Sequence, residues 1–378
     1  MKTKTVLFTA RHGLLDGFII KIAEVAPTFF FHPDIREPVE IGKATSITVV
    51  CKTLGLAKIF TFLKLETLTP SYIKNFNEKI RDKNIDTVVT LDFFRFLFVQ
   101  ALHYKKSHPE VKLFLYSETQ KWPKNIISHL AMRIFWWYLK LNLRHINKVF
   151  VFTEQGRIFF ESNLKGNVPV CLIPVPVDTD RFFPDPDKVF MEKGVLRILM
   201  NARFVGYKNH KDLFKALRIL NEKGGQFELT LIGRAGGLKD EILGHAKKLG
   251  LGEVVRHREA VPHDEMRSVY LDHDVLVLPS YNEAIGMVVP EAMACGLATI
   301  TSDTVGANTY VKEGETGLIF STGDVEALAA ALFKIADADI LQRFGLAASK
   351  EIRENYTIDT LEERFLKAIG EDSKTKDD

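Results

Sequence analysis

The stretch VLVLPSYNEAIGMVVPEAMACG, residues 275–296, contains the pattern that decides the fold. Its first residues form an apolar run that predicts a buried strand. Pro290 suits the first position of a following helix, where a missing N–H costs nothing, and Gly296 suits the left-handed position just past the helix end. The stretch therefore predicts a strand, a loop and a short helix. In an open α/β sheet, ligands bind beside such loops, at the carboxyl ends of the strands.

The loop inside this stretch leads to two glutamates that cannot share one helix face. Glu283 and Glu291 are eight residues apart, with Gly286 and Pro290 between them. We interpret them as separate acceptors for one ligand rich in hydroxyl groups. Gly286 lets the backbone approach a ligand closely, and amides near a helix start favour an anion such as a diphosphate. The alternative for Glu291 is that the helix dipole alone favours a glutamate in a first turn.

The segment from Glu283 to Glu291 resembles the E-x7-E motif of retaining GT-B glycosyltransferases of family 4, the glycosyl transferases group 1. The similarity is strong from about residue 196 to 335 and partial before it. It implies an α/β fold with two Rossmann-like, doubly wound domains facing a central cleft and a C-terminal helix that crosses back. It also implies that Glu283 contacts the donor sugar and that Glu291 holds the ribose.

Length and composition agree with two domains. The chain has 378 residues, of which 46% are hydrophobic and 26% are charged, an ordinary globular composition on a chain long for one core. Four prolines cluster within residues 169–184 and place the domain boundary there. We expect a first, acceptor-side domain at 1–178, a nucleotide-sugar domain at 179–355, a crossover helix at 356–370 and a disordered tail at 371–378.

Charge and cysteine usage exclude several classes of function. The net charge of +3 argues against a strongly basic nucleic-acid binder, and three separated cysteines without a CxxC pair predict neither disulfides nor a metal site. There is no signal-peptide pattern and no uncharged apolar run of spanning length, so we expect a cytoplasmic protein. The sequence also lacks the G-x-G-x-x-G and P-loop fingerprints.

A second pair of candidate residues follows the strand predicted at 196–202. Arg203 comes directly after this strand and Lys208 five residues later, which places both cations at the ligand edge of the sheet. Two solvated surface charges are the alternative. The resembled family has the same Arg-x4-Lys on the donor diphosphate, so we assign Arg203, Lys208 and Glu283 as catalytic residues. The cations would stabilise charge on the leaving diphosphate.

The resemblance implies further residues on both sides of the reaction. Donor and nucleotide contacts fall on Gly13, Gly233, Arg258, Gly286, Met287 and Val288. On the acceptor side we expect His12 and Glu118. Family members often place a histidine near residue 118, so Glu118 either replaces it or that role is absent, and His12 is equally compatible with a loop residue without a role. The resemblance implies no metal, and no Asp-x-Asp run after a strand contradicts this.

Residues 121–148 form the most unusual segment of the first half. Aromatic and aliphatic residues alternate with cations, and no Asp or Glu occurs between Thr119 and Thr153. The cations are Lys121, Lys124, Arg133, Lys140, Arg144 and Lys148. A basic amphipathic helix rich in Trp and Phe can lie on an anionic membrane surface. The alternative is a core helix with a basic polar face.

Together these patterns predict a retaining glycosyltransferase that moves a sugar from a UDP- or GDP-sugar to a glycan or lipid-linked acceptor. A peripheral location at the cytoplasmic membrane face is the second part of this hypothesis. One rival is a nucleotide-sugar 2-epimerase of the same fold. Another is a non-catalytic sugar-nucleotide-binding protein, which the missing histidine near Glu118 favours. The presence of Arg203, Lys208, Glu283 and Glu291 opposes it.

Overall fold

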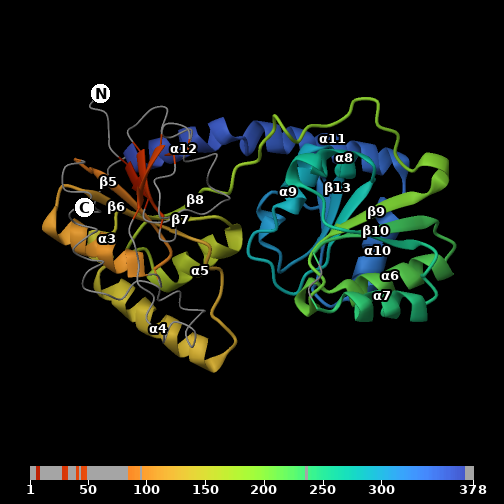
Figure 1. Ribbon diagram of the computed structural model, residues 1–378, viewed down its shortest axis with the longest axis horizontal. Coiled ribbons are helices and arrows are strands. Elements are labelled where there is room, and N and C mark those ends of the chain that lie inside the picture. The colour runs from red at the N-terminus through yellow and green to blue at the C-terminus, as the bar shows by residue number, and fades with distance from the viewer. Residues whose placement is uncertain are drawn as a thin grey trace. The chain divides into compact units, whose positions relative to one another are not determined.

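The computed structural model describes residues 84–93, 96–234 and 237–370, and only four short strands before residue 84 (Figure 1). The chain forms two compact units, one of Met1–Pro176 with Ile358–Asp378 and the other of Val177–Thr357. Each unit is a parallel or nearly parallel sheet with helices. The predicted tail at 371–378 lies outside the described residues.

The first unit is built on an eight-stranded sheet with the order β3-β4-β2-β1-β5-β6-β7-β8. Neighbouring strands are parallel except β3 and β4. The strands are β1 (Val6–Phe8), β2 (Thr28–His32), β3 (Glu40–Ile41), β4 (Ala44–Thr48), β5 (Thr87–Leu91), β6 (Lys112–Ser117), β7 (Lys148–Val151) and β8 (Val170–Leu172). β5 and β7 are buried along their whole length, as expected for parallel strands covered on both faces.

Four described helices belong to this unit: α3 (Phe96–Ser107), α4 (Ile126–Leu141), α5 (Glu154–Leu164) and α12 (Ile358–Gly370). The C-terminal helix α12 packs on β7, because Phe365 contacts Phe150 with ring centroids 5.2 Å apart. The Lys148 ammonium, which is buried, donates to the Ala368 carbonyl at 2.7 Å. The predicted return of the C-terminal helix to the first unit is thus confirmed. The prediction that Lys148 is one of the surface cations is wrong, because its buried ammonium anchors that helix.

The second unit has six parallel strands in the order β11-β10-β9-β12-β13-β14. They are β9 (Leu196–Asn201), β10 (Phe227–Ile232), β11 (Val255–Arg258), β12 (Val275–Leu278), β13 (Ala298–Ser302) and β14 (Gly317–Phe320). In chain order this is 3-2-1-4-5-6, the doubly wound arrangement whose winding reverses between its first and fourth strands. That reversal, the switch point, lies between β9 and β12.

The helices of the second unit are α6 (His210–Glu222), α7 (Lys239–Lys248), α8 (Met266–Leu271), α9 (Val288–Ala294), α10 (Val325–Ile335) and α11 (Ala338–Asn355). Gly296, with φ of 78°, takes the predicted left-handed position after α9. The prediction for Pro290 was wrong by two residues, because α9 begins at Val288. Proline is tolerated there since the first four helical N–H groups have no partner within the helix.

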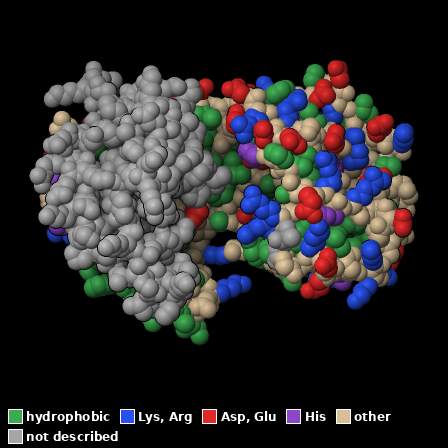
Figure 2. All heavy atoms as spheres, in the orientation of Figure 1, with side chains coloured by type: hydrophobic (Ala, Val, Ile, Leu, Met, Phe, Trp, Pro, Cys, Tyr) green, Lys and Arg blue, Asp and Glu red, His purple; other side chains and the backbone are tan. Residues whose placement is uncertain are grey.

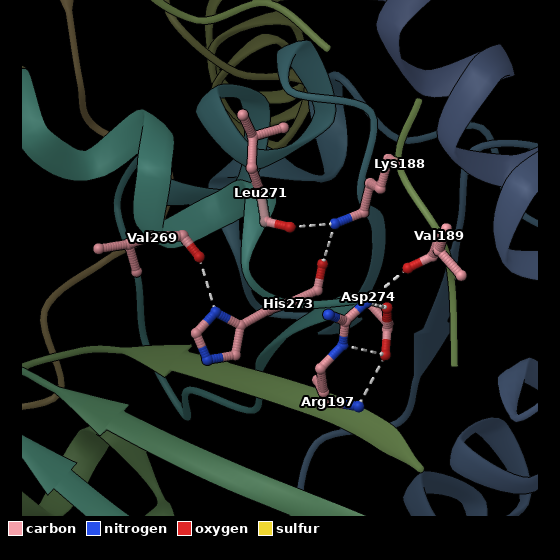
Figure 3. A network of polar contacts seen from close by, with 7 residues as sticks. All are labelled: Lys188, Val189, Arg197, Val269, Leu271, His273 and Asp274. Carbon is pink, nitrogen blue, oxygen red and sulfur yellow. Dashed lines mark hydrogen bonds and ion pairs between the residues drawn. The ribbon is translucent and has the colours of Figure 1, made fainter. Parts of the chain in front are cut away.

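A polar network fixes the edge of the second sheet opposite the switch-point loops (Figure 3). Asp274, which is fully buried, accepts from the Arg197 guanidinium at 2.6 and 3.1 Å and from the Arg197 amide at 2.8 Å. The Lys188 ammonium donates to the carbonyls of Leu271 and His273 at 2.5 and 2.6 Å, and burial lowers its pKa to about 8. These contacts join the start of β9 to the start of β12 and cap α8.

Asp274→Asn should destabilise the second unit by about 3 kcal/mol, because a mostly buried guanidinium loses its carboxylate. Thermal unfolding followed by circular dichroism would measure the shift. Glu222→Gln is the matched control, because its ion pair with Arg218 is exposed on both sides and should contribute less than about 1 kcal/mol. Equal, small shifts for both variants would show that the network is not a determinant of stability.

Candidate functional site

The loops that follow β9 and β12 meet at the switch point. Lys208, at the end of the first loop, forms an ion pair with Glu283 of the second, and their side chains are only 11% and 18% exposed. The amide of Tyr281 also donates to the Tyr207 carbonyl at 2.8 Å, which joins the two loops through the backbone. The structure therefore brings together two of the three residues predicted to be catalytic, at the edge where doubly wound sheets bind ligands.

Arg203 lies near the same ion pair but is exposed. Its guanidinium donates to the Tyr207 hydroxyl and lies 6.0 Å from the centre of that ring, and the Lys208 ammonium lies 5.6 Å from the same centre. Tyr207 thus contacts both cations. Sequence reasoning missed this residue, although an aromatic residue inside the Arg-x4-Lys loop was the available signal.

The electrostatics of the ion pair are those of a partly desolvated site. Burial and the nearby Arg203 lower the pKa of Lys208 to about 8, while pairing with Glu283 favours the charged form. The neighbouring His210 adds no charge, because burial and Lys208 lower its pKa to about 4. An unliganded site with one cation and one carboxylate in contact can exchange either partner for a ligand group.

Local backbone geometry holds Glu283 in place. Its carbonyl accepts from the Gly306 amide at 2.9 Å, and its backbone forms a parallel bridge with Val305. Gly286 has φ of 82°, and a Cβ there would lie 3.0 Å from the Glu283 Cγ and 3.3 Å from the Leu278 Cδ2. A side chain at residue 286 would therefore be both strained and crowded against the glutamate.

Glu291 is buried in the first turn of α9, and both of its carboxylate oxygens have partners. Oε1 lies 2.9 Å from His263 Nε2, and Oε2 accepts from the Tyr270 hydroxyl at 2.8 Å. His263 Nδ1 lies 2.9 Å from the Arg181 guanidinium. Because the Glu291 carboxylate favours the imidazolium, it raises the pKa of His263, and burial together with Glu291 raises the pKa of Tyr270 well above its usual value.

Sequence reasoning missed His263 and Tyr270 because their link to Glu291 is long-range. Tyr270 lies on α8 and His263 on the short turn before it, 21 and 28 residues ahead of Glu291. No hydrogen bond or ion pair in the described part of the chain joins Glu291 to the Lys208–Glu283 pair. The second unit therefore presents two separate acidic positions, as the sequence indicated.

The remaining predicted residues have varied surroundings. A Cβ on Gly233 would lie 2.0 Å from the Ala202 carbonyl oxygen, so close packing of the loops after β9 and β10 already requires glycine. Arg258 is exposed at the end of the edge strand β11, and Met287 and Val288 are partly buried at the start of α9. Glu118 lies in the first unit, where its amide donates to Asp92 at 3.2 Å. His12 and Gly13 lie outside the described residues.

Within the described residues, no group of three or more His, Cys, Asp or Glu side chains is placed to hold a metal ion. The acidic and cationic residues of the site instead pair with one another, as the contacts of Lys208 and Glu291 illustrate.

Comparison with known proteins gives these contacts a context. Residues 184–350 match the model of the glycosyl transferases group 1 family. The D-inositol 3-phosphate glycosyltransferase of Corynebacterium jeikeium is 29% identical over 187 residues, 46% of this chain and 45% of that protein. A GDP-mannose-dependent alpha-(1-6)-phosphatidylinositol monomannoside mannosyltransferase of Mycolicibacterium smegmatis is 30% identical over 173 residues, 42% of this chain and 45% of that protein. The chain thus matches a little under half the length of these relatives.

Solved structures are similar over nearly the whole chain. Sucrose-phosphate synthase of Thermosynechococcus elongatus has a TM-score of 0.75 at 18% identity, covering 97% of this chain and 98% of that one. Anabaena HepE in complex with UDP has a TM-score of 0.74 at 14% identity, covering 97% and 100%. The fold is therefore that of the GT-B proteins, which confirms the predicted class. The match to the glycosyl transferases group 1 model, residues 184–350, lies within the second unit.

His263→Gln should change thermal stability in a pH-dependent way. The folded-state pKa of His263 is raised by Glu291, so its stabilising contribution is fully present below the ordinary histidine pKa of about 6.5. It is lost as the pH rises through the raised folded-state pKa. The difference in melting temperature between wild type and His263→Gln should therefore be largest at acidic pH and shrink above neutrality. A difference that does not vary with pH would contradict the His263–Glu291 assignment.

Proposed function

We propose that this protein is a retaining glycosyltransferase that uses a nucleotide-diphosphate-sugar donor bound at the switch point of the second unit. The observation that carries the proposal is the Lys208–Glu283 ion pair, which unites a phosphate-binding cation and a sugar-binding carboxylate where doubly wound sheets bind ligands. The family match and the names of the similar transferases support the same activity.

In this mechanism, binding of the donor breaks the ion pair between Lys208 and Glu283. The diphosphate replaces Glu283 as the partner of Lys208, with Arg203 as a second cation, and the released Glu283 accepts hydrogen bonds from sugar hydroxyls. When the bond between the anomeric carbon and the diphosphate oxygen breaks, the electron pair leaves with the diphosphate. The oxygen of the acceptor hydroxyl forms the new bond to the anomeric carbon, and the hydroxyl proton passes to the leaving diphosphate. Cations fixed in a partly desolvated site stabilise that developing charge. The Gly286 and Met287 backbone would assist them.

Glu291 would hold the ribose of the nucleotide. His263 and Tyr270 already orient its carboxylate, whose oxygens would accept hydrogen bonds from two vicinal hydroxyls. We assign Gly13, Gly233, Arg258 and Val288 to the nucleotide side, and His12 and Glu118 to the acceptor side, on the family resemblance. The reaction would need no metal.

The donor and acceptor classes follow from the relatives. HepE is similar in fold and its structure holds UDP, while one relative is GDP-mannose-dependent, so we propose a UDP- or GDP-sugar as donor. That mannosyltransferase acts on a phosphatidylinositol monomannoside, which supports a glycan or lipid-linked acceptor. We place the reaction at the cytoplasmic face of a membrane.

A surface on α4 supports membrane attachment. Six large apolar side chains of this helix are 59% to 83% exposed, although each belongs to a residue type that is normally buried. This α4 stripe consists of Ile126, Ile127, Leu130, Ile134, Trp137 and Leu141. Exposed cations lie beside it, which suits an anionic bilayer surface. No helix in the described ranges has the length and apolarity to cross a bilayer.

Calorimetric titration with UDP, GDP and ADP in turn should detect binding of one of them. Glu291→Ala should weaken that binding about 100-fold, because two charge-assisted hydrogen bonds are lost. Lys208→Ala should weaken the nucleoside diphosphate by about tenfold or more but leave the corresponding nucleoside unaffected. Arg218→Ala, an exposed cation on α6, is the matched control.

The outcomes separate the three candidate functions. Binding of none of the three nucleotides would oppose the transferase and both rivals. Binding together with conversion of a nucleotide sugar in the absence of acceptor would indicate the 2-epimerase. Binding without any turnover, across a panel of acceptors, would indicate the non-catalytic protein.

Leu130→Ser with Ile134→Ser should weaken cosedimentation with anionic vesicles at low salt by at least about tenfold, because two apolar side chains no longer enter the bilayer. Leu346→Ser is the control, since Leu346 is 64% exposed on α11 of the second unit. Absence of wild-type binding at low salt, where electrostatic attraction is strongest, would exclude the membrane surface.

A further inference from the structure

Two adjoining hollows lie between α4 and α5 in the first unit, with volumes of about 430 and 520 Å³. They share Lys140 and Asn163, so they form one α4–α5 groove. The first is lined by Trp122, His129, Arg133, Trp136, Trp137, Lys140 and Asn163, and the second by Lys140, Leu143, Arg144, Asn163, Leu164, Lys165 and Asn167. The described lining includes four cations and no carboxylate.

The groove runs along one flank of the α4 stripe. On α4 the residues that line it follow the spacing 129, 133, 136 and 140, which keeps them on one side of a helix with 3.6 residues per turn. The exposed apolar residues 130, 134, 137 and 141 follow the same spacing one position later. Trp137 belongs to both sets. The stripe and the groove therefore adjoin each other on α4, with Trp137 at their border.

The cations of the groove have no carboxylate partner among the residues that the structure describes. Among the described residues, neither Arg133 nor Lys140 forms an ion pair, whereas the glutamates of the adjacent α5, Glu154 and Glu161, are both paired with Arg157. Arg133 and Lys140 are exposed on the same flank of α4. Together they produce a positive potential that an anion can neutralise. The groove is thus charged in a way that the protein itself does not balance.

Trp136 forms a rigid part of the groove wall. Trp136 is 5% exposed, and its indole N–H is buried without an acceptor in the described structure. Its ring is fixed by edge-on contacts with Trp122, Phe93 and Phe159 at centroid distances of 5.7, 5.1 and 5.4 Å. These contacts hold the Trp136 ring rigidly in the wall of the groove.

We propose that the α4–α5 groove binds the headgroup of an anionic phospholipid in a bilayer, an inference that rests on the membrane attachment proposed above. The lipid phosphate accepts from Arg133 and Lys140. The α4 stripe enters the acyl layer, and Trp122 and Trp137 lie at the interface that tryptophan prefers. Charge on the flank and apolar surface beside it favour a lipid over a soluble polyanion, which would leave the stripe uncovered.

The chain offers a direct probe, because its three tryptophans are Trp122, Trp136 and Trp137, all of which line the groove. Full-length protein is titrated with vesicles of phosphatidylcholine alone and of phosphatidylcholine mixed with phosphatidylglycerol. The mixed vesicles should shift tryptophan emission to shorter wavelength and protect it from acrylamide. Vesicles of phosphatidylcholine alone should do neither.

Arg133→Gln with Lys140→Gln should weaken the response about 30-fold, from two basic residues at an anionic surface. Asn163→Glu, which adds a carboxylate between both hollows without removing a cation, should weaken it as well. The control removes the same charge from exposed lysines of the second unit, as Lys334→Gln with Lys350→Gln, and should change the affinity by less than about twofold.

Equal loss in the groove pair and the control pair would overturn the proposal, since net charge alone would then explain binding. So would full binding by both groove variants when Leu130→Ser with Ile134→Ser has lost it, which would leave only apolar insertion. Nucleotide binding by the same variants should stay at the wild-type level. For the wild-type protein, absence of vesicle binding with intact nucleotide binding rejects the groove, whereas vesicle binding without nucleotide binding rejects the transferase.

Discussion

The pairing of β9 with β12 is the constraint on which the second unit depends. Two register pairs, Ile198 with Val275 and Leu199 with Leu276, place the first and fourth strands side by side and so create the switch point. The buried Arg197–Asp274 contact holds the beginnings of these strands, and the loops at their ends supply Lys208 and Glu283. The pairing of β9 with β12 thus determines where Lys208 and Glu283 meet.

Local patterns were enough to predict much of this unit. The strands at Leu196–Asn201 and Val275–Leu278, and the left-handed Gly296, follow from apolar runs and backbone preference alone. Partners brought together by the fold were not predictable: the contacts of Glu291 with His263 and Tyr270 depend on how α8 packs. Asn209 shows the same limit: it directly precedes α6, but its side-chain amide donates to Asp212 and to the Pro279 carbonyl and does not cap the helix.

The two units differ in whether their charged side chains have partners. In the second, the buried ionisable groups of the site are already paired, so a ligand must exchange one partner for another. In the first, one predicted cation, Lys148, is consumed by anchoring α12, while Arg133 and Lys140 stay exposed without a carboxylate. The sequence pattern of residues 121–148 could not separate these cases, because only burial distinguishes an anchoring lysine from a surface one.

The two ends of the second unit lie beside each other. Val177 forms a parallel bridge with Thr357, and its amide donates to the Tyr356 carbonyl at 2.9 Å. Since α12 belongs to the first unit, the second unit is an insertion in the first. The chain enters and leaves the second unit at two segments that are hydrogen-bonded to each other. A segment closed in this way can be replaced as one piece, so recombination between relatives can exchange the second unit without altering the core of the first.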